Sequence, residues 1–261
     1  MKVRGNLPWM ASETRSSGIS RRLFSEALGT ATLVAAIVGS AIMGANLTDD
    51  AGLTLLINMV STVLALGVLI WILGPVSGAH FNPAVTTIAA IRREVPVGES
   101  VLYVICQIGG GLLGVALANV MFDLPAWHTS DKARAEPDLL LGELVATAGL
   151  LLVIGALTRT GNGRLGPLLV PAWIGAAMFF ASSTSFANPA VTISRAFTDT
   201  FSGVDPTSVV PMIVAQLIGA GIGALITEVL YPRKGIPEPL DLPAPVHETE
   251  QLAVQPDEGE R

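Results

Sequence analysis

The sequence predicts an all-α membrane protein with six transmembrane helices and two re-entrant half-helices, arranged as an inverted repeat. Three observations support this prediction. The 261-residue chain is 51% hydrophobic and only 14% charged, with a mean hydropathy of +0.59, which is too apolar for a typical soluble domain. Six nearly uncharged stretches are each long enough to cross a bilayer. The sequence Asn-Pro-Ala-Val-Thr occurs twice, at residues 82–86 and 188–192.

The six stretches divide the chain into a membrane domain and two tails. Residues 1–22 are polar and lack the apolar core of a signal peptide, so we expect a cytoplasmic N-terminal tail. Residues 232–261 are rich in Pro and Glu and cannot bury a core, so we expect a disordered acidic tail. The membrane domain should cover residues 23–231, with repeats at about 23–122 and 139–231. Its expected spans are about 24–45, 52–74, 98–122, 139–158, 167–184 and 207–230.

Each Asn-Pro-Ala motif indicates the start of a short helix. Asn is a favoured N-cap residue, and Pro is favoured at the first helical position, where no hydrogen-bond donor is lost. The helices that follow, at about 82–92 and 188–197, cross only about half of a hydrocarbon core roughly 30 Å thick. Irregular backbone at that depth is tolerated only where it is buried in protein or lines a watery cavity. We therefore expect a pore or a binding site where the two half-helices begin.

The two halves of the chain carry the same polar residues in the same order. Glu26 lies in the first span of the first half and Glu143 in the first span of the second, while Gln107 and Gln216 lie in the last span of each. A three-span unit that is repeated once must be inverted in the membrane, because an odd number of crossings reverses the second copy. The two half-helices should therefore enter from opposite faces. Gly-rich stretches at 109–114 and 219–223 suit close helix crossings.

Charge gives the orientation and excludes several functions. With both termini in the cytoplasm, only Lys132, Arg134 and Arg195 of the 15 Lys and Arg residues lie outside, as the positive-inside rule requires. The acidic excess lies in the C-terminal tail, so nothing indicates nucleic-acid binding. Three scattered His residues and the single Cys106 form no metal-ligand pattern. No catalytic constellation is in register, so we expect neither a cofactor nor an enzyme.

Opposed half-helices would favour the passage of small uncharged molecules. Their N-termini place two positive dipole ends near the bilayer centre, where cations and hydronium are repelled. The side-chain amides of Asn82 and Asn188 can each donate a hydrogen bond to a passing oxygen, replacing part of the hydration that it loses. Helix capping by the same two residues is compatible with this role, because the carbonyl can cap while the amide faces the pore.

These features resemble those of the aquaporin and aquaglyceroporin (major intrinsic protein) family, over about residues 23–231. The resemblance rests on the paired motifs, on residues 77–81 (Ser-Gly-Ala-His-Phe) and on the repeated Glu and Gln positions. It implies an aquaporin-like fold in the lipid bilayer, a pore in every protomer and a homotetramer. It also implies a scaffold role for Glu26 and Glu143, which would accept hydrogen bonds from the amides of the re-entrant loops. The pore motifs that it assigns are Asn82, Pro83, Ala84, Asn188, Pro189 and Ala190.

The chain departs from the family at the selectivity filter. Most members have Arg directly after the second motif, where this chain has Val191. The spacing of the family places Thr62, Ala176 and Ser185 at the other three filter positions. All four side chains are small or medium in size and none is charged. The resemblance therefore implies a wide pore for small neutral solutes such as water and glycerol-like polyols.

Two residues near the expected pore have open roles. Arg195 lies on about the same helical face as Val191, one turn nearer the outside, and we offer the hypothesis that it partly replaces the missing filter charge from the outer vestibule. The favoured alternative is an interfacial Arg that pairs with Asp199 or extends to water. His80 either lines the cytoplasmic part of the pore or packs its loop by hydrogen bonds.

The alternatives to this passive channel are an ion-coupled secondary transporter with inverted repeats and a strictly water-selective aquaporin. A coupled transporter usually needs a titratable group at the midplane, and only Glu26 and Glu143 are candidates. Residues 182–200 resemble bacterial family members associated with arsenic resistance, in which the filter Arg is likewise absent. That resemblance implies metalloid acids such as arsenous acid as solutes, and a location in the bacterial inner (plasma) membrane.

Overall fold

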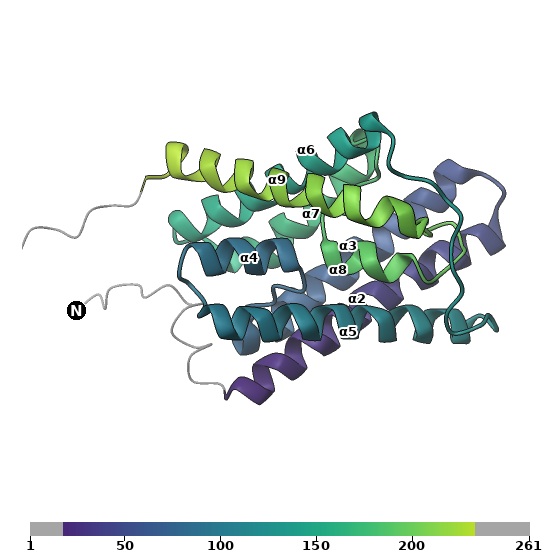
Figure 1. The fold of residues 1–261 in the computed structure, drawn as a ribbon, viewed down its shortest axis with the longest axis horizontal. Coiled ribbons are helices and arrows are strands. Elements are labelled where there is room, and N and C mark those ends of the chain that lie inside the picture. Colours follow the sequence, from purple (N-terminus) through teal and green to yellow (C-terminus); the bar gives the residue numbers. More distant parts are fainter. Residues whose placement is uncertain (1–17, 233–261) are drawn as a thin grey trace, which may run out of the picture.

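The structure is a computed structural model that describes residues 18–232, and these residues form eight α-helices and one turn of 3-10 helix. We use the labels of Figure 1, in which the first described helix is α2. The predicted tails at 1–17 and 233–261 lie outside the described residues. The elements are α2 (Ile19–Leu47), α3 (Ala51–Ser77), α4 (Pro83–Ile91), α5 (Val97–Met121), α6 (Pro137–Arg159), η2 (Gly163–Leu165), α7 (Gly166–Phe180), α8 (Pro189–Arg195) and α9 (Pro206–Leu230).

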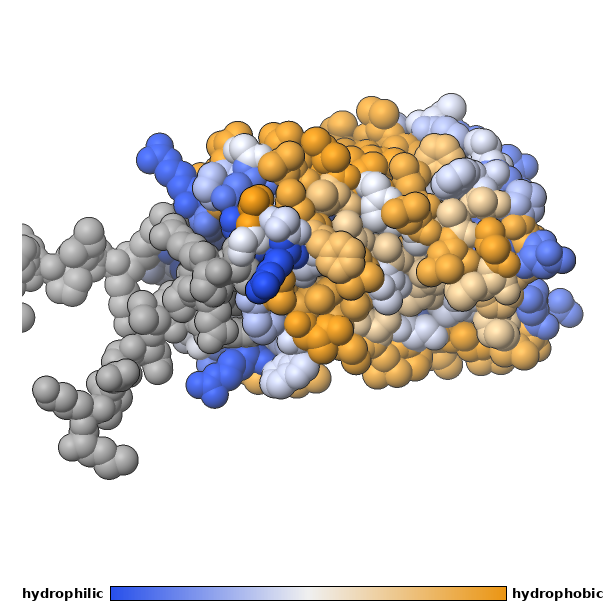
Figure 2. Space-filling view, turned by 90° about the horizontal axis from the view of Figure 1, so that it is seen from below, coloured by the Kyte–Doolittle hydropathy of each residue, from blue (hydrophilic) through white to orange (hydrophobic). Residues whose placement is uncertain are grey.

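Six of these elements are long and apolar enough to cross a membrane, namely α2, α3, α5, α6, α7 with η2, and α9. Figure 2 shows the consequence on the surface, where a broad apolar belt separates two hydrophilic ends. Helices α4 and α8 are the two half-helices, and each begins at Pro directly after its Asn N-cap. The fold class predicted from the sequence, an all-α membrane protein with six spans and two half-helices, is confirmed.

The two largest differences between predicted and observed boundaries are at the start of α2 and the end of α7. Helix α2 begins at Ile19, inside the stretch that was assigned to the N-terminal tail, because the basic residues Arg21 and Arg22 extend the first span instead of preceding it. Helix α7 ends at Phe180 and not near residue 184. The residues after it turn sharply toward α8, with Thr184 and Ser185 in the left-handed region (φ of 63° and 53°), which no helix can accommodate.

The two halves of the chain pack as an inverted pair. Helix α2 packs along α5 and α6 along α9, while α3 contacts α7 between the halves. Glycines permit these crossings, since a Cβ at Gly110 of α5 would overlap the carbonyl oxygen of Ala27, and one at Gly219 of α9 would overlap that of Leu144. Figure 1 shows α4 and α8 entering from opposite ends of the bundle and meeting near its middle. The first described residue of α2 and the last of α9 lie at the same end.

Candidate pore between the half-helices

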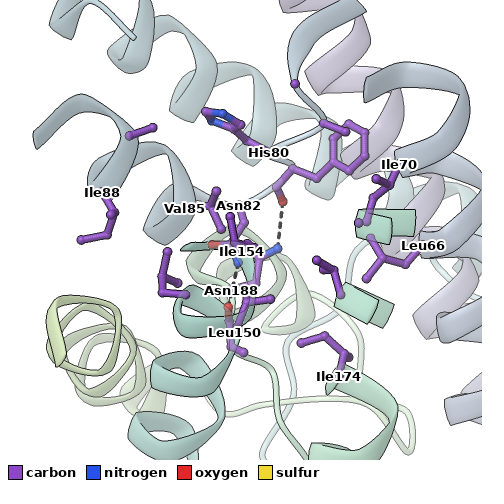
Figure 3. A pocket seen from close by; sticks show the side chains of 18 of the residues that line it. Leu66, Ile70, His80, Asn82, Val85, Ile88, Leu150, Ile154, Ile174 and Asn188 are labelled. Carbon is purple, nitrogen blue, oxygen red and sulfur yellow. Dashed lines mark hydrogen bonds between the residues drawn. The ribbon is translucent and has the colours of Figure 1, made fainter. Parts of the chain in front are cut away.

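A cavity of about 820 Å³ runs along the bundle beside both half-helices. Its lining extends from Arg93 and Glu99 at one end, which we call the inner mouth, to Thr184 and Arg195 at the other, the outer mouth. The wall opposite the half-helices is apolar, and Figure 3 shows these side chains around the two asparagines. The labelled apolar residues of that wall are Leu66, Ile70, Leu150, Ile154 and Ile174, while Val85 and Ile88 line the cavity from half-helix α4.

Asn82 and Asn188 join the two half-helices end to end. The Nδ2 group of Asn82 donates to the carbonyl oxygen of Ala187 at 2.7 Å, and that of Asn188 donates to the carbonyl oxygen of Phe81 at 2.8 Å. Each Oδ1 atom caps its own half-helix by accepting from the backbone N–H two residues later, at 2.9 and 3.0 Å. Both residues line the cavity, and within residues 18–232 each amide retains a second N–H without a recorded partner.

Glu26 accepts hydrogen bonds from the loop before α4 and fixes its position. Its carboxylate is fully buried and accepts from the backbone N–H groups of His80 (3.0 Å) and Phe81 (2.7 Å), and also from Ser77 Oγ (2.6 Å). Gln107 Nε2 donates to the same carboxylate at 2.8 Å and to Thr86 Oγ1 on α4 at 2.9 Å. These hydrogen bonds give the buried charge the partners that it needs and fix the loop to its half-helix.

Glu143 does the same for the loop before α8. It accepts from the backbone N–H groups of Phe186 and Ala187, each at 2.8 Å, and from Gln216 Nε2 at 2.6 Å. Gln216 also donates to Thr192 Oγ1 on α8 at 2.8 Å. The repeat extends to the backbone, because the residues one and three positions before each Asn have positive φ. They are Ala79, Phe81, Ser185 and Ala187, at φ values of 50°, 48°, 53° and 48°.

Such left-handed conformations cost on the order of 1–3 kcal/mol each for non-glycine residues. They persist here because the two buried carboxylates hold the loop amides. The geometry accords with the expected scaffold role of Glu26 and Glu143, and it leaves neither carboxylate exposed to the cavity.

Three of the four predicted filter residues line the same cavity. Thr62 of α3, Ser185 of the loop and Val191 of α8 line the cavity and are 4%, 5% and 2% exposed. The hydroxyl groups of Thr62 and Ser185 are buried without a hydrogen-bond partner in the described part of the chain. A buried hydroxyl without a partner costs about 1–3 kcal/mol, so both are available to a molecule that passes between them.

The prediction is wrong at Ala176. This residue lies on the exposed outer face of α7 and does not line the cavity. The spacing rule fails because α7 ends at Phe180, and a displacement of two positions rotates a residue about 200° around a helix. Ile174 and Met178 supply the wall from α7 instead. Residues four positions apart lie on one face of a helix, so the spacing of Ile174 and Met178 indicates a common face. The prediction used only the number of residues between Ala176 and the second motif.

Arg195 is buried, not interfacial. It is 7% exposed, lines the outer mouth of the cavity, and stacks on the ring of Phe186 with its Cζ 3.4 Å from the ring centroid. Its Nε donates to the carbonyl oxygen of Ser202. The favoured alternative, pairing with Asp199, is wrong, because Asp199 accepts from Ser130 Oγ at 3.2 Å and forms no ion pair with Arg195.

His80 combines the two roles that were left open. Its ring lines the inner half of the cavity, and its Nδ1 lies 3.0 Å from Thr86 Oγ1. The ring also meets Tyr103 edge to face, with a centroid distance of 5.5 Å. Phe186 occupies the equivalent place in the second half, two residues before Asn188. Aligning the two halves would have singled out Phe186 in the sequence, whereas Arg134, which also approaches its ring, carries no such signal.

The apolar belt, the six spans and the two half-helices that meet beside a cavity define an integral membrane protein with a cavity along the bundle of a single chain. Comparison with known proteins agrees. The Major intrinsic protein family profile matches residues 13–187. The chain therefore belongs to the major intrinsic protein family, a family of membrane channels.

Individual relatives support the same assignment. The chain is 46% identical over 219 residues to aquaglyceroporin AqpS of Rhizobium meliloti, covering 84% of this chain and 94% of that protein. It is 30% identical to aquaporin NIP2-1 of Arabidopsis thaliana, over 80% of this chain and 75% of that one. The solved aquaglyceroporin of Plasmodium falciparum has the same fold, with a TM-score of 0.64 at 21% identity, covering 82% of this chain and 98% of the other.

Proposed function

We propose that the protein is a passive channel for water, glycerol and similar small uncharged solutes. The observation that carries the proposal is the convergence of the Asn82 and Asn188 amides on a cavity whose opposite wall is apolar. A polyol has both faces that such a passage needs, because its hydroxyls can accept from the amides while its carbon backbone contacts Leu150, Ile154 and Ile174. Similarity to aquaglyceroporin AqpS supports the same solute class.

Ions fit this passage poorly. Removing a small ion from water costs several kcal/mol even after relaxation, and the apolar wall supplies nothing to offset that cost. Cations are further opposed at the middle of the pore, because the N-terminal ends of α4 and α8 present partial positive charge there. A neutral solute loses less hydration and recovers part of it from the asparagine amides and from the free hydroxyls of Thr62 and Ser185.

Metalloid acids belong to the same class of solute. Arsenous acid is neutral at physiological pH and carries three hydroxyls, as glycerol does. The filter region suits it, because Val191 leaves the position after the second motif uncharged and Thr62 and Ser185 offer hydroxyls without partners. We include arsenous acid among the proposed solutes on this ground.

Arg195 supplies the only positive side chain that lines the outer mouth within residues 18–232. Its burial and its contact with Phe186 support the hypothesis that it partly replaces the missing filter charge, one helical turn farther out than Val191. From that place it opposes cations before they reach the asparagines, while the pore at Val191 stays wide enough for a polyol.

We further propose that the protein is a homotetramer in a bacterial inner membrane, with both termini in the cytoplasm. The exposed apolar side chains of the outer surface support close packing against lipid or further protomers. The two ends of the described chain lie on one side, which supports a common location for the termini.

The Val191→Arg variant tests the solute class. Purified protein in vesicles is challenged with water, glycerol and arsenous acid in stopped-flow light scattering. We expect rapid entry of all three through the native channel, and a larger loss for glycerol and arsenous acid than for water in the variant, since Arg narrows and charges the filter. Entry of water alone through the native protein would refute the wide filter. Ala176→Arg, on the outer face of α7, is the matched control.

A further inference from the structure

Two guanidinium groups lie against the ring of Phe186 near the outer mouth, and of these Arg195 lines the cavity. Arg134, in the loop between α5 and α6, lies with its Cζ 5.4 Å from the centroid of the Phe186 ring, and Arg195 lies 3.4 Å from the same centroid. Their Nε atoms donate to consecutive carbonyl oxygens, Arg195 to that of Ser202 and Arg134 to that of Gly203. These contacts hold both cations near one aromatic ring and two consecutive carbonyl groups.

Backbone hydrogen bonds join the loop that carries Arg134 to the residues that follow α8. These bonds hold Arg134 in place. The backbone N–H of His128 donates to the carbonyl oxygen of Phe197, and that of Ser130 to the carbonyl oxygen of Ala196, both at 3.2 Å. The backbone N–H of Arg134 itself donates to Ser208 Oγ at 2.9 Å. Figure 1 shows this loop crossing the end of the bundle beside α8.

Neither guanidinium has a carboxylate partner within residues 18–232. Every ion pair recorded among these residues lies at the inner mouth, where Arg22 pairs with Glu99 and both Arg92 and Arg159 pair with Glu228. Near the outer mouth, the acidic side chains of the described residues form hydrogen bonds to other groups or are exposed. Glu143 is bound to its loop and to Gln216, and Asp199 accepts from Ser130, while Glu136 is exposed at the start of α6.

Two adjacent cations without a counter-charge are costly in a partly desolvated site, and Arg does not escape the cost by losing its proton at neutral pH. Burial lowers the pKa of the Arg134 guanidinium, with the carboxylates of Glu143 and Glu136 acting in the opposite direction. After the Nε bond, each guanidinium keeps four further N–H donors, for which no partner is recorded in the described chain. These planar donor sets are well suited to an anion.

We propose that Arg134 and Arg195 form a binding site for a small monovalent anion at the outer mouth, and that the bound anion slows the passage of neutral solutes. The anion offsets the paired charge and occupies space beside Phe186, where Arg195 lines the pathway. The second part of the proposal rests on the proposed channel function, whereas the binding site itself does not.

Binding is tested directly with bromide. Crystals of the full chain grown in bromide should give an anomalous scattering peak between the two guanidinium groups. Arg134→Gln should abolish it, and Arg134→Lys, which keeps the charge without the planar donors, should weaken it. No peak in the native protein overturns the site.

The effect on flux is tested in vesicles by comparing glycerol entry in chloride with entry in hexafluorophosphate, a bulky and weakly hydrogen-bonding anion, at equal ionic strength. Chloride should lower the rate by up to about two-fold at half occupancy, because the occupied fraction conducts more slowly than the unoccupied one. Arg134→Gln should remove the difference between the salts, whereas Arg164→Gln, an exposed arginine of η2, should retain it.

The outcomes separate the two claims. A bromide peak with no chloride effect means an adventitious ion only and overturns the regulatory part. An absence of glycerol entry in either salt refutes the proposed function, while the bromide experiment still decides the binding site.

Discussion

Replacing Glu143 with Gln tests how the pore is held open. The carboxylate accepts three hydrogen bonds, from Phe186 N and Ala187 N at 2.8 Å and from Gln216 Nε2 at 2.6 Å. An amide of the same shape keeps one oxygen and turns an NH₂ group toward a buried donor. At least one charge-assisted bond is lost and one donor is left unsatisfied, whereas the variant gains by no longer burying a charge. The lost bonds outweigh that gain, and we expect a net destabilisation of about 2–3 kcal/mol.

The loop before α8 should relax in this variant, because the positive φ values of Ser185 and Ala187 cost energy that the carboxylate bonds now offset. Each 1.4 kcal/mol is a tenfold change in an equilibrium constant, so a loss of about 2–3 kcal/mol shifts the balance toward the relaxed loop by roughly 30- to 150-fold, and glycerol entry into vesicles should fall. The midpoint of thermal unfolding in detergent should fall by about 5–10 °C. Glu136→Gln, on an exposed Glu without a side-chain capping bond, is the control. Native-like flux and thermal stability in the Glu143 variant would refute the scaffold role.

The remaining predictions concern the pore wall. Ile174→Phe should reduce glycerol entry severalfold in stopped-flow assays, whereas Ala176→Phe should not, because only Ile174 of the two lines the cavity. Equal effects of the two variants would contradict the assignment of Ile174 to the cavity wall. Thr62→Val should not destabilise the protein and should raise its stability by up to about 1–3 kcal/mol, because the hydroxyl has no partner to lose and its burial is costly. The variant should lower the glycerol-to-water permeability ratio, and an unchanged ratio would argue against a role for Thr62 in solute recognition. Asn188→Asp should admit cations, because it replaces an N–H donor with a negative charge at the meeting point of the half-helices. The measurement is a sodium current in planar bilayers. An absence of current would argue against this mechanism of cation exclusion.

The fold could be predicted from the sequence because its determinants are local. Hydropathy marks the spans, and an Asn followed by Pro marks each half-helix start, since capping and the missing proline N–H act within one turn. The inversion follows from an odd number of spans. The scaffold contacts of Glu26 and Glu143 were also expected, although from the family resemblance.

The filter was harder to predict because it depends on where helices end and how they rotate. Counting residues placed Ala176 in the pore, but the loop after Phe180 adopts left-handed turns that shorten α7 and change which face points inward. The position of Arg195 depends on the carbonyl oxygen of Ser202 and the ring of Phe186, and both lie outside its own helix. Helix periodicity describes a single helix and carries no information about such partners.

The most direct test of passive conduction is the concentration dependence of glycerol entry into vesicles, measured by stopped-flow light scattering with and without an imposed proton or sodium gradient. A pore that solutes traverse without a coupled ion predicts initial rates that rise linearly with glycerol concentration and are the same under every gradient. Entry that saturates and follows the proton or sodium gradient would contradict the channel and establish a coupled transporter.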